Sequence, residues 1–253
     1  MALEILVPAV TALVAVIVFV AGDRLHPKTW RQTDDDTVGA LVLNLINTIF
    51  MAVVAFIVVI AWQQYDNARN HTIAEAKALI DTYWAAHGMP EPDHARIQGL
   101  VRDYTEQVLD EEWAVMAGHG RLSQSTQDTL DTLRDAVAAV DAADPDVDTL
   151  RTNALTSLDA VAQARADRAL DAGYRVPGFL YLAMWICTVL LLLSVVLSGV
   201  QVTKRSVVTT ALLGAIVGVV IRAIYNLDEP YSGGNLVSKD AFELALSRYQ
   251  HTT

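Results

Sequence analysis

The chain has 253 residues, a formal net charge of −11 and 53% hydrophobic residues. A soluble globular domain seldom combines so high an apolar content with so large a net charge. The two properties are segregated along the chain, because long apolar segments stand apart from one strongly acidic segment. Composition therefore argues against an ordinary soluble protein, and the acidic balance argues against a nucleic-acid partner.

Four segments are long and nearly free of charged residues, namely residues 5–21, 38–62, 178–200 and 206–227. A hydrocarbon core ~30 Å thick is crossed by roughly 20 helical residues. Three segments meet this length, and Ala2 and Leu3 extend the first one. We therefore predict an all-α integral membrane protein with four transmembrane helices, a multi-pass protein of the cell membrane with the lipid bilayer as its solvent.

The first apolar segment could also be read as a cleaved signal peptide. Glu4 precedes it and no Lys or Arg does, which is unlike the basic start of a signal peptide, so we expect a retained helix. Cys187 is the single cysteine of the chain. An intrachain disulfide and a thiolate metal cluster are therefore excluded.

Residues 63–177 form a long insertion between the second and third apolar segments. They carry 20 Asp and Glu against 10 Lys and Arg, a net charge of −10, which is almost the whole charge of the chain. This pattern predicts a division into spans one and two (residues 1–62), an acidic helical extramembrane domain (63–177), spans three and four (178–227), and an acidic Pro-aromatic turn with a C-terminal tail (228–253).

The start of the insertion has helical periodicity. Ile73, Ile80 and Tyr83 recur at helical spacing, which predicts that the second membrane helix continues into the insertion. Gly88 and Pro90 would end it.

Three further helices are predicted in the insertion. One begins after Asp93 and is broken at Gly118. The next begins near Ser125, with Asp128 in the acid position of a capping box. The last begins at the pair Asp144 and Pro145, a cap residue followed by proline at the first helical position. Their amphipathic stripes predict a packed bundle.

The charge distribution gives two opposing indications of topology. With four spans, the two short loops share one side, and they hold most of the basic residues outside the insertion, namely Arg24, Lys28, Arg31, Lys204 and Arg205. The positive-inside rule then places the insertion outside. Basic residues also flank the membrane on the insertion side, namely Arg69, Lys77, Arg165, Arg168 and Arg175.

The sequence has no catalytic or metal-binding signature. A paired-histidine helix motif, a Cys-x-x-Cys pair and a phosphate-binding loop are all missing. The six histidines are scattered and are expected to be solvated, as is the acidic run Asp110-Glu111-Glu112. We predict neither an enzyme nor a bound cofactor or metal.

The second apolar segment carries polar side chains on one face. Asn44, Asn47 and Thr48 are followed at helical spacing by Met51. Buried amides in hydrocarbon cost free energy unless they find partners or water. Two interpretations stay open. The amides clamp neighbouring helices, or they line a polar path contributed once per subunit.

Arg222 is the single charged residue inside the fourth segment. Ionisable residues at such depth usually face a cavity or a partner, although arginine can also extend to the interface. Asn226 lies one turn further along on the same face, followed by Asp228 and Glu229. An ion pair from Arg222 to this acidic pair is a structural hypothesis.

Several short motifs resemble those of a bestrophin-like family of prokaryotic membrane proteins. They are the run Leu227-Asp228-Glu229-Pro230-Tyr231-Ser232-Gly233, the run Val237-Ser238-Lys239-Asp240-Ala241-Phe242, the pair Tyr65-Asp66 after Trp62, and the triplet Glu111-Glu112-Trp113. The resemblance covers most of the chain: two spans, a large helical insertion, two more spans and an acidic Pro-aromatic turn.

The resemblance implies an architecture and a function. Bestrophins are pentameric ion channels whose second helix lines the pore, and whose insertion lies in the cytoplasm. Pro230 and Tyr231 match the Pro-aromatic pair that follows their fourth span. In animal members this turn belongs to a calcium clasp, but its acidic residues follow the pair, whereas Asp228 and Glu229 precede it here. The nearby oxygen donors are too few for the six to eight ligands that calcium takes.

The combined prediction is a homo-oligomeric ion channel, with inorganic ions as its substrates. Asn44, Asn47, Thr48 and Met51 would line the path, and the fourth-helix exit, residues 222–231, would brace or gate it. The acidic insertion would favour cations over anions. The alternative is a non-conducting membrane scaffold or sensor whose helical insertion binds a partner.

Overall fold

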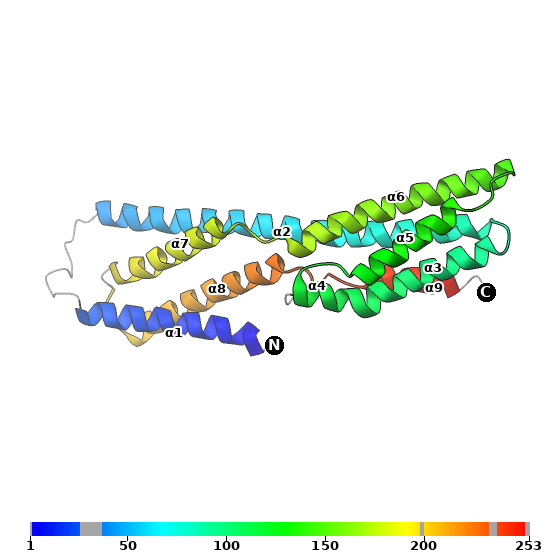
Figure 1. The fold of residues 1–253 in the computed structure, drawn as a ribbon. Helices are drawn as coiled ribbons and strands as arrows, with labels where there is room; N and C mark the ends of the chain where they lie inside the picture. Colours follow the sequence, from blue (N-terminus) through cyan, green and yellow to red (C-terminus); the bar gives the residue numbers. More distant parts are fainter. Residues whose placement is uncertain (1, 26–36, 198–199, 233–236, 251–253) are drawn as a thin grey trace. The chain divides into compact units, whose positions relative to one another are not determined.

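The structure is a computed structural model that describes residues 2–25, 37–197, 200–232 and 237–250 (Figure 1). All regular secondary structure within these residues is helical. The chain divides into two compact units. Unit 1 comprises Met1–Trp62 and Val176–Asp228, and unit 2 comprises Gln63–Arg175 and Glu229–Thr253.

Unit 1 contains α1 (Ala2–Leu25), the first half of α2 (Thr37–His87), α7 (Gly178–Leu197) and α8 (Lys204–Asp228). These four helices are long and apolar enough to cross a membrane. Large apolar side chains such as Leu6, Phe179 and Ile216 are exposed on the single chain. A water-soluble monomer rarely shows such a surface, so this unit is embedded in a membrane.

Helices α1 and α8 pack closely because α8 carries two glycines on the shared face. A Cβ added to Gly214 would lie 2.7 Å from the carbonyl oxygen of Thr11, and one added to Gly218 would lie 2.6 Å from the Cα of Pro8. The Gly-x-x-x-Gly spacing therefore lets two backbones meet. Residues further along α1 contact residues earlier in α8, so the two helices are antiparallel.

Unit 2 is a helical bundle. It contains the second half of α2, α3 (Asp93–Gln107), the π-helix η2 (Val108–Glu112), α4 (Trp113–His119), α5 (Gln124–Ala138), α6 (Pro145–Gly173) and α9 (Asp240–Gln250). Its core is built from the inward stripes of these helices, for example Leu79, Val101, Leu133, Leu158 and Phe242.

Several local predictions are confirmed. Helix α2 runs without a break through Trp62 and ends at His87, directly before Gly88. Helix α6 begins at Pro145, and the Asp144 carboxylate accepts a hydrogen bond of 2.8 Å from the Asp146 N–H. An N-terminal cap and a proline at the first helical position thus act as the sequence predicts.

One local prediction is wrong, and one helix was not predicted. Helix α5 begins at Gln124, and its N-cap residue Ser123 makes no side-chain capping bond, so the capping box at Ser125 does not form. The Ser125 hydroxyl instead bonds that of Ser123. The helix that was not predicted is α9, which follows the Pro-aromatic turn and buries Phe242 and Tyr249 in the core of unit 2.

Candidate functional site

The face of α2 that carries the predicted pore-lining residues is not covered by the other residues that the structure describes. Asn44, Thr48 and Met51 are all exposed, and 62% of the Met51 surface is accessible. The Thr48 hydroxyl donates a hydrogen bond of 2.9 Å to the Asn44 carbonyl oxygen, so the threonine is satisfied within its own helix. Asn47 lies at the edge of this face, and its Oδ1 atom is buried with no hydrogen-bond partner.

The opposite side of α2 is the one that packs. Ile57 and Ala61 are fully buried within the chain. The exposed half of the α2 surface therefore has two edges. One edge is polar and carries Asn44 and Thr48, and the other is apolar and carries Leu45 and Ile49. Apolar side chains suit lipid, whereas an exposed amide suits water or another protein surface.

The end of α8 is fixed by Asp228. One carboxylate oxygen accepts a hydrogen bond of 2.6 Å from the Val176 N–H, and the other accepts one of 2.8 Å from the Tyr181 hydroxyl. The Tyr181 ring stacks on that of Tyr225, with centroids 4.9 Å apart. Asp228 thereby ties the end of α8 to the start of α7.

Arg222 does not form the predicted ion pair with the acidic residues that follow it. Both Asp228 oxygens have other partners, and among the described residues Glu229 bonds the Ser232 hydroxyl at 3.2 Å. The Nε atom of Arg222 and the Oδ1 atom of Asn226 are buried without hydrogen-bond partners. The structure thus brings Asp228 to α7, and leaves the Arg222 Nε and Asn226 Oδ1 atoms without a hydrogen-bond partner.

The Pro-aromatic turn belongs to unit 2. The Pro230 carbonyl accepts a hydrogen bond of 2.8 Å from the Val237 N–H, and the Tyr231 hydroxyl lies 3.4 Å from the Ala68 carbonyl oxygen of α2. The Tyr231 ring meets the Trp113 ring edge to face, with centroids 5.9 Å apart. Burial raises the pKa of the Tyr231 hydroxyl, so this phenol is neutral at any ordinary pH.

Arg168 is the centre of a buried ion network in unit 2 that sequence reasoning missed. Its guanidinium is fully buried and donates two hydrogen bonds to the Glu75 carboxylate, at 2.8 and 2.9 Å. A third bond of 2.6 Å reaches the Glu112 carboxylate. One arginine of α6 therefore joins α2 to the π-helix η2.

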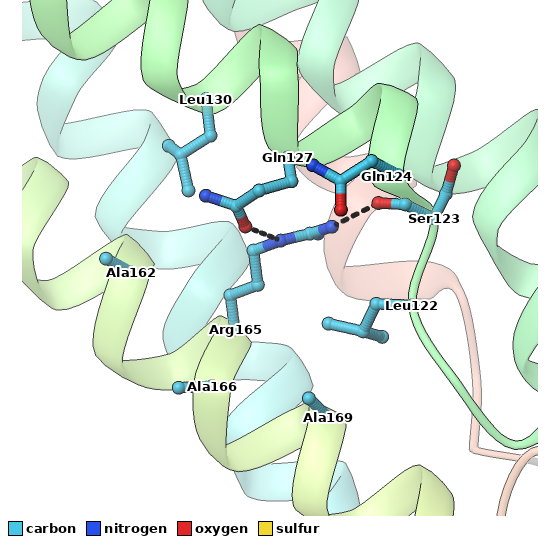
Figure 2. A pocket seen from close by; sticks show the side chains of 9 residues that line it. All are labelled: Leu122, Ser123, Gln124, Gln127, Leu130, Ala162, Arg165, Ala166 and Ala169. Atoms are coloured by element: carbon cyan, nitrogen blue, oxygen red, sulfur yellow. Dashed lines mark hydrogen bonds between the residues drawn. The ribbon is translucent and has the colours of Figure 1, made fainter.

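Arg165, one turn earlier in α6, completes the network. It donates to both oxygens of Glu112, at 2.9 and 2.7 Å, and to the Tyr104 hydroxyl at 3.1 Å. Its Nε bonds the Gln127 side-chain oxygen and one Nη bonds the Ser123 carbonyl, as Figure 2 shows. All five N–H groups of this guanidinium are satisfied.

The Arg165 guanidinium also borders a cavity of about 390 Å³ between α5 and α6 (Figure 2). Alanines 162, 166 and 169 of α6 form one wall of it, and Leu122 and Leu130 contribute apolar side chains. Because every donor of Arg165 is engaged, this cavity offers no free cation to a ligand.

The network is electrically balanced, with two carboxylates and two guanidiniums. Burial alone would raise the pKa of Glu112, but the Arg168 charge and the bonds from Arg165 outweigh it and hold that pKa below its ordinary value. Burial, together with the nearby Glu75 charge, raises the pKa of the Tyr104 hydroxyl, which donates a 2.6 Å hydrogen bond to Glu75. The phenol is therefore neutral and acts as a donor to the carboxylate.

Two of the motifs that carry the family resemblance, the Glu111-Glu112-Trp113 triplet and the Val237–Phe242 run, meet at Arg168. Its guanidinium lies 5.9 Å from the Trp113 ring centroid and 5.5 Å from that of Phe242. Lys239 donates a 2.7 Å hydrogen bond to the Leu109 carbonyl within the π-helix, and its ammonium lies 5.7 Å from the Trp113 centroid. The motif residues thus build the surroundings of one buried charge.

The network also corrects two expectations from the sequence. Arg165 and Arg168 were assigned to the membrane flank, but both are buried in unit 2, so neither counts toward the topology. Glu112 was expected on a solvated face and is fully buried. His71, expected to be solvated, is partly buried and lies 2.7 Å from the Asp171 carboxylate.

The described residues contain no group of three or more His, Cys, Asp or Glu side chains placed to hold a metal ion. The candidate functional features are thus an uncovered polar face on a membrane helix of unit 1 and a buried, charge-balanced ion network in unit 2. These features define an α-helical membrane protein with four candidate spans and a second, helical unit.

The sequence matches the Bestrophin-like domain over residues 9–242. The chain belongs to the bestrophin-like family, whose members are ion channels and form oligomers. A comparison with curated proteins gave no match.

Two solved structures have a similar fold. One is a point variant of a bacterial bestrophin homologue from Klebsiella pneumoniae, with a TM-score of 0.70 and 13% identity, over 98% of this chain and 97% of that one. The other is described as a membrane protein with a single substitution, with a TM-score of 0.71 and 14% identity, over 96% and 97% of the two chains. At such low identity the likeness concerns the fold alone.

Proposed function

We propose that this chain forms a homo-oligomeric ion channel in the cell membrane, with the polar edge of α2 lining the conduction path. The observation that supports this most is the exposure of Asn44 and Thr48 on an otherwise apolar membrane helix. Lipid cannot satisfy an amide, so the exposed amide favours a water-filled axis. Membership of a family of channels supports the same reading.

The remaining features of the assembly are part of this proposal. Unit 2 is the helical insertion outside the bilayer, joined by the turn after α8. By the family resemblance the oligomer is a pentamer. The insertion carries a net charge of −10, which concentrates cations near the mouth of the path, so the channel prefers cations to anions.

Flux into liposomes tests the proposal. Purified protein is reconstituted, and potassium and chloride fluxes are compared for the wild type, Asn44→Leu and Asn47→Leu. Replacing an amide by an apolar side chain on the path is expected to slow cation flux roughly tenfold, as a barrier increase of about 1.4 kcal/mol would do. Ile49→Leu, on the apolar edge of the same exposed half, is the matched control and should conduct like the wild type.

Two outcomes would contradict the proposal. Equal flux for all four proteins would remove the amides from the path. A lack of flux at every voltage and gradient would favour the alternative, a non-conducting scaffold or sensor whose helical unit binds a partner.

A further inference from the structure

Helices α2 and α9 form an exposed apolar patch on unit 2. Ile73 of α2 and Leu244 of α9 are both exposed, and together with Ala241 they line a cavity of about 350 Å³. The charged residues Arg69 and Asp240 also line this cavity. An exposed hollow with apolar walls suits an apolar side chain of a partner. We call these five residues the α2–α9 patch.

A large apolar side chain projects from another helix of the same unit. Leu170 of α6 has 73% of its surface exposed, the largest fraction among the large apolar side chains described in unit 2. Its neighbours on the helix surface are Asp167, three residues before it, and Tyr174, four residues after it. The projection therefore has an apolar tip with an acidic group beside it.

Bonds within the chain show that the patch and the projection lie at the same height along unit 2. Two pairs join the antiparallel helices α2 and α6, namely His71 with Asp171 at 2.7 Å and Glu75 with Arg168 at 2.8 Å. Ile73 is midway between the two α2 residues of these pairs, and Leu170 lies between the two α6 residues. Because each residue advances a helix by about 1.5 Å, Ile73 and Leu170 differ in height by less than about 2 Å.

Within one chain these two side chains point in different directions. Ile73 is two residues from both His71 and Glu75, so it lies about 200° around α2 from the side that contacts α6. Leu170 lies about 200° around α6 from the buried Arg168. A contact between the patch and the projection therefore needs two copies of the chain, each using a different surface. Such a heterologous contact closes into a ring when the rotation allows it.

We propose that, in a ring of copies whose axis runs along α2, Leu170 of one copy fills the α2–α9 patch of the next. Rotation about such an axis keeps every residue at its height along α2. The equal height of Ile73 and Leu170 is therefore what this ring requires. The inference rests on the homo-oligomer of the proposed function, and it does not depend on conduction.

The charges beside the two surfaces are complementary. Lys77 lies about 3 Å beyond Glu75 on α2, and Asp167 lies about 1.5 Å from Arg168 on α6. Since the two helices are antiparallel, both shifts run in the same direction, so Lys77 and Asp167 also have matching heights. Lys77 is exposed and Asp167 is partly exposed. The ammonium of one copy thus meets the carboxylate of the next, and such a pair at the rim of an interface fixes its register.

Disulfide cross-linking in membranes tests the proposal. Cys187→Ser removes the single native cysteine, and Ile73→Cys and Leu170→Cys are introduced together in that chain. Oxidation is expected to give a ladder of covalent oligomers, because each copy contributes one cysteine to the contact on either side. Chains with either introduced cysteine alone should give no cross-link. The same two chains co-expressed should give covalent dimers and nothing larger.

Ile73→Cys with Ala160→Cys is the matched control. Ala160 is also exposed on α6, but it lies about 15 Å from Leu170 along the helix, a distance that no disulfide spans. The charge pair is tested in the chain that gives the ladder. Asp167→Lys places a like charge beside Lys77 and should lower the ladder yield about fivefold, and adding Lys77→Glu should restore the yield.

The outcomes separate this inference from the proposed channel. An assembly that is oligomeric by light scattering, yet gives no ladder from the Ile73 and Leu170 positions, would overturn the inference and leave the channel standing. A cross-link from Ile73→Cys alone would also overturn it, because the patch would then meet its own copy across a two-fold axis. A ladder in a protein without ion flux would support the contact and contradict the channel.

Discussion

The two units differ in how their buried charged groups are paired. The ion network of unit 2 encloses four charges, Glu75, Glu112, Arg165 and Arg168, and each is bonded to another. Unit 1 has few polar side chains, yet Asn47, Arg222 and Asn226 each leave a buried atom unbonded. In unit 2 the unbonded buried atoms belong to Thr126 and Arg151, outside the network. The ion network of unit 2 is therefore satisfied within that unit, whereas the described part of unit 1 keeps buried polar atoms without a bonded partner.

The largest loss of stability is expected when Arg168, the central charge of unit 2, is removed. Arg168→Ala would leave Glu75 and Glu112 buried with only Arg165 beside them. Breaking a buried pair by removing one partner costs ~3–5 kcal/mol, because an uncompensated charge stays behind. Urea unfolding in detergent, followed by the fluorescence of Trp113 and the other tryptophans, measures the change.

Arg134→Ala is the control for that experiment. Arg134 forms an exposed ion pair with Asp159 on the surface of unit 2. Its removal should cost at most ~1 kcal/mol. Equal losses for the two variants would show that the network adds no more than a surface ion pair, and the contrast between the units would then fail.

A smaller loss of stability is expected from a substitution in unit 1, where close helix packing rather than ion pairing holds α1 and α8 together. Gly218→Ala puts a Cβ into the Thr11 side chain and 2.6 Å from the Pro8 Cα, so α1 and α8 must separate. Overpacking of this kind typically costs ~1–3 kcal/mol. Gly99→Ala in α3 meets no atom within 4 Å, so it should stabilise by ~0.5–1 kcal/mol through helix propensity alone. Thermal unfolding of the two variants should therefore shift in opposite directions.

The smallest expected loss of stability is the one caused by lowering the pH. The pKa of Glu112 is lower in the folded protein than its ordinary value of 4.5. Its contribution to stability is therefore complete above pH ~4.5 and is lost as the pH falls through the folded pKa. The free energy of unfolding should fall more steeply below pH ~4.5 for the wild type than for Glu112→Gln. Parallel pH profiles would mean that Glu112 is not held as a carboxylate by the two arginines.

The membrane helices could be predicted from the sequence because hydrocarbon imposes a simple rule of length and apolarity. The close contact of α1 with Gly214 and Gly218 also agrees with the spacing of those glycines. Helix α9 was missed because its stripe, Phe242, Ala245 and Tyr249, is short and follows a turn. Such a helix is stable through packing on a bundle rather than through its own propensity.

The ion network carried a signal that periodicity could have found. The buried stripe of α6 runs through Ala154, Leu158 and Val161, and its next positions are Arg165 and Arg168. Two arginines on an apolar stripe predict buried partners, because a lone buried charge is too costly. Which carboxylates pair with these two arginines depends on the packing of three helices that are distant in sequence. Helical periodicity does not contain that information.

The π-helix η2, which follows α3, affects which single-residue insertions and deletions this part of the chain tolerates. Each residue advances an α-helix by about 100°, so one residue more or less turns everything downstream by that angle. The wide turn Val108–Glu112 takes up one extra residue without such a rotation, so Glu112 and Trp113 face Arg168. Lys239 donates a hydrogen bond to the Leu109 carbonyl within this turn. A single-codon deletion within this turn, before Glu112, would therefore close it to an α-turn and leave Glu112 and Trp113 facing Arg168. The same deletion earlier in α3 would turn both side chains away from the buried arginine.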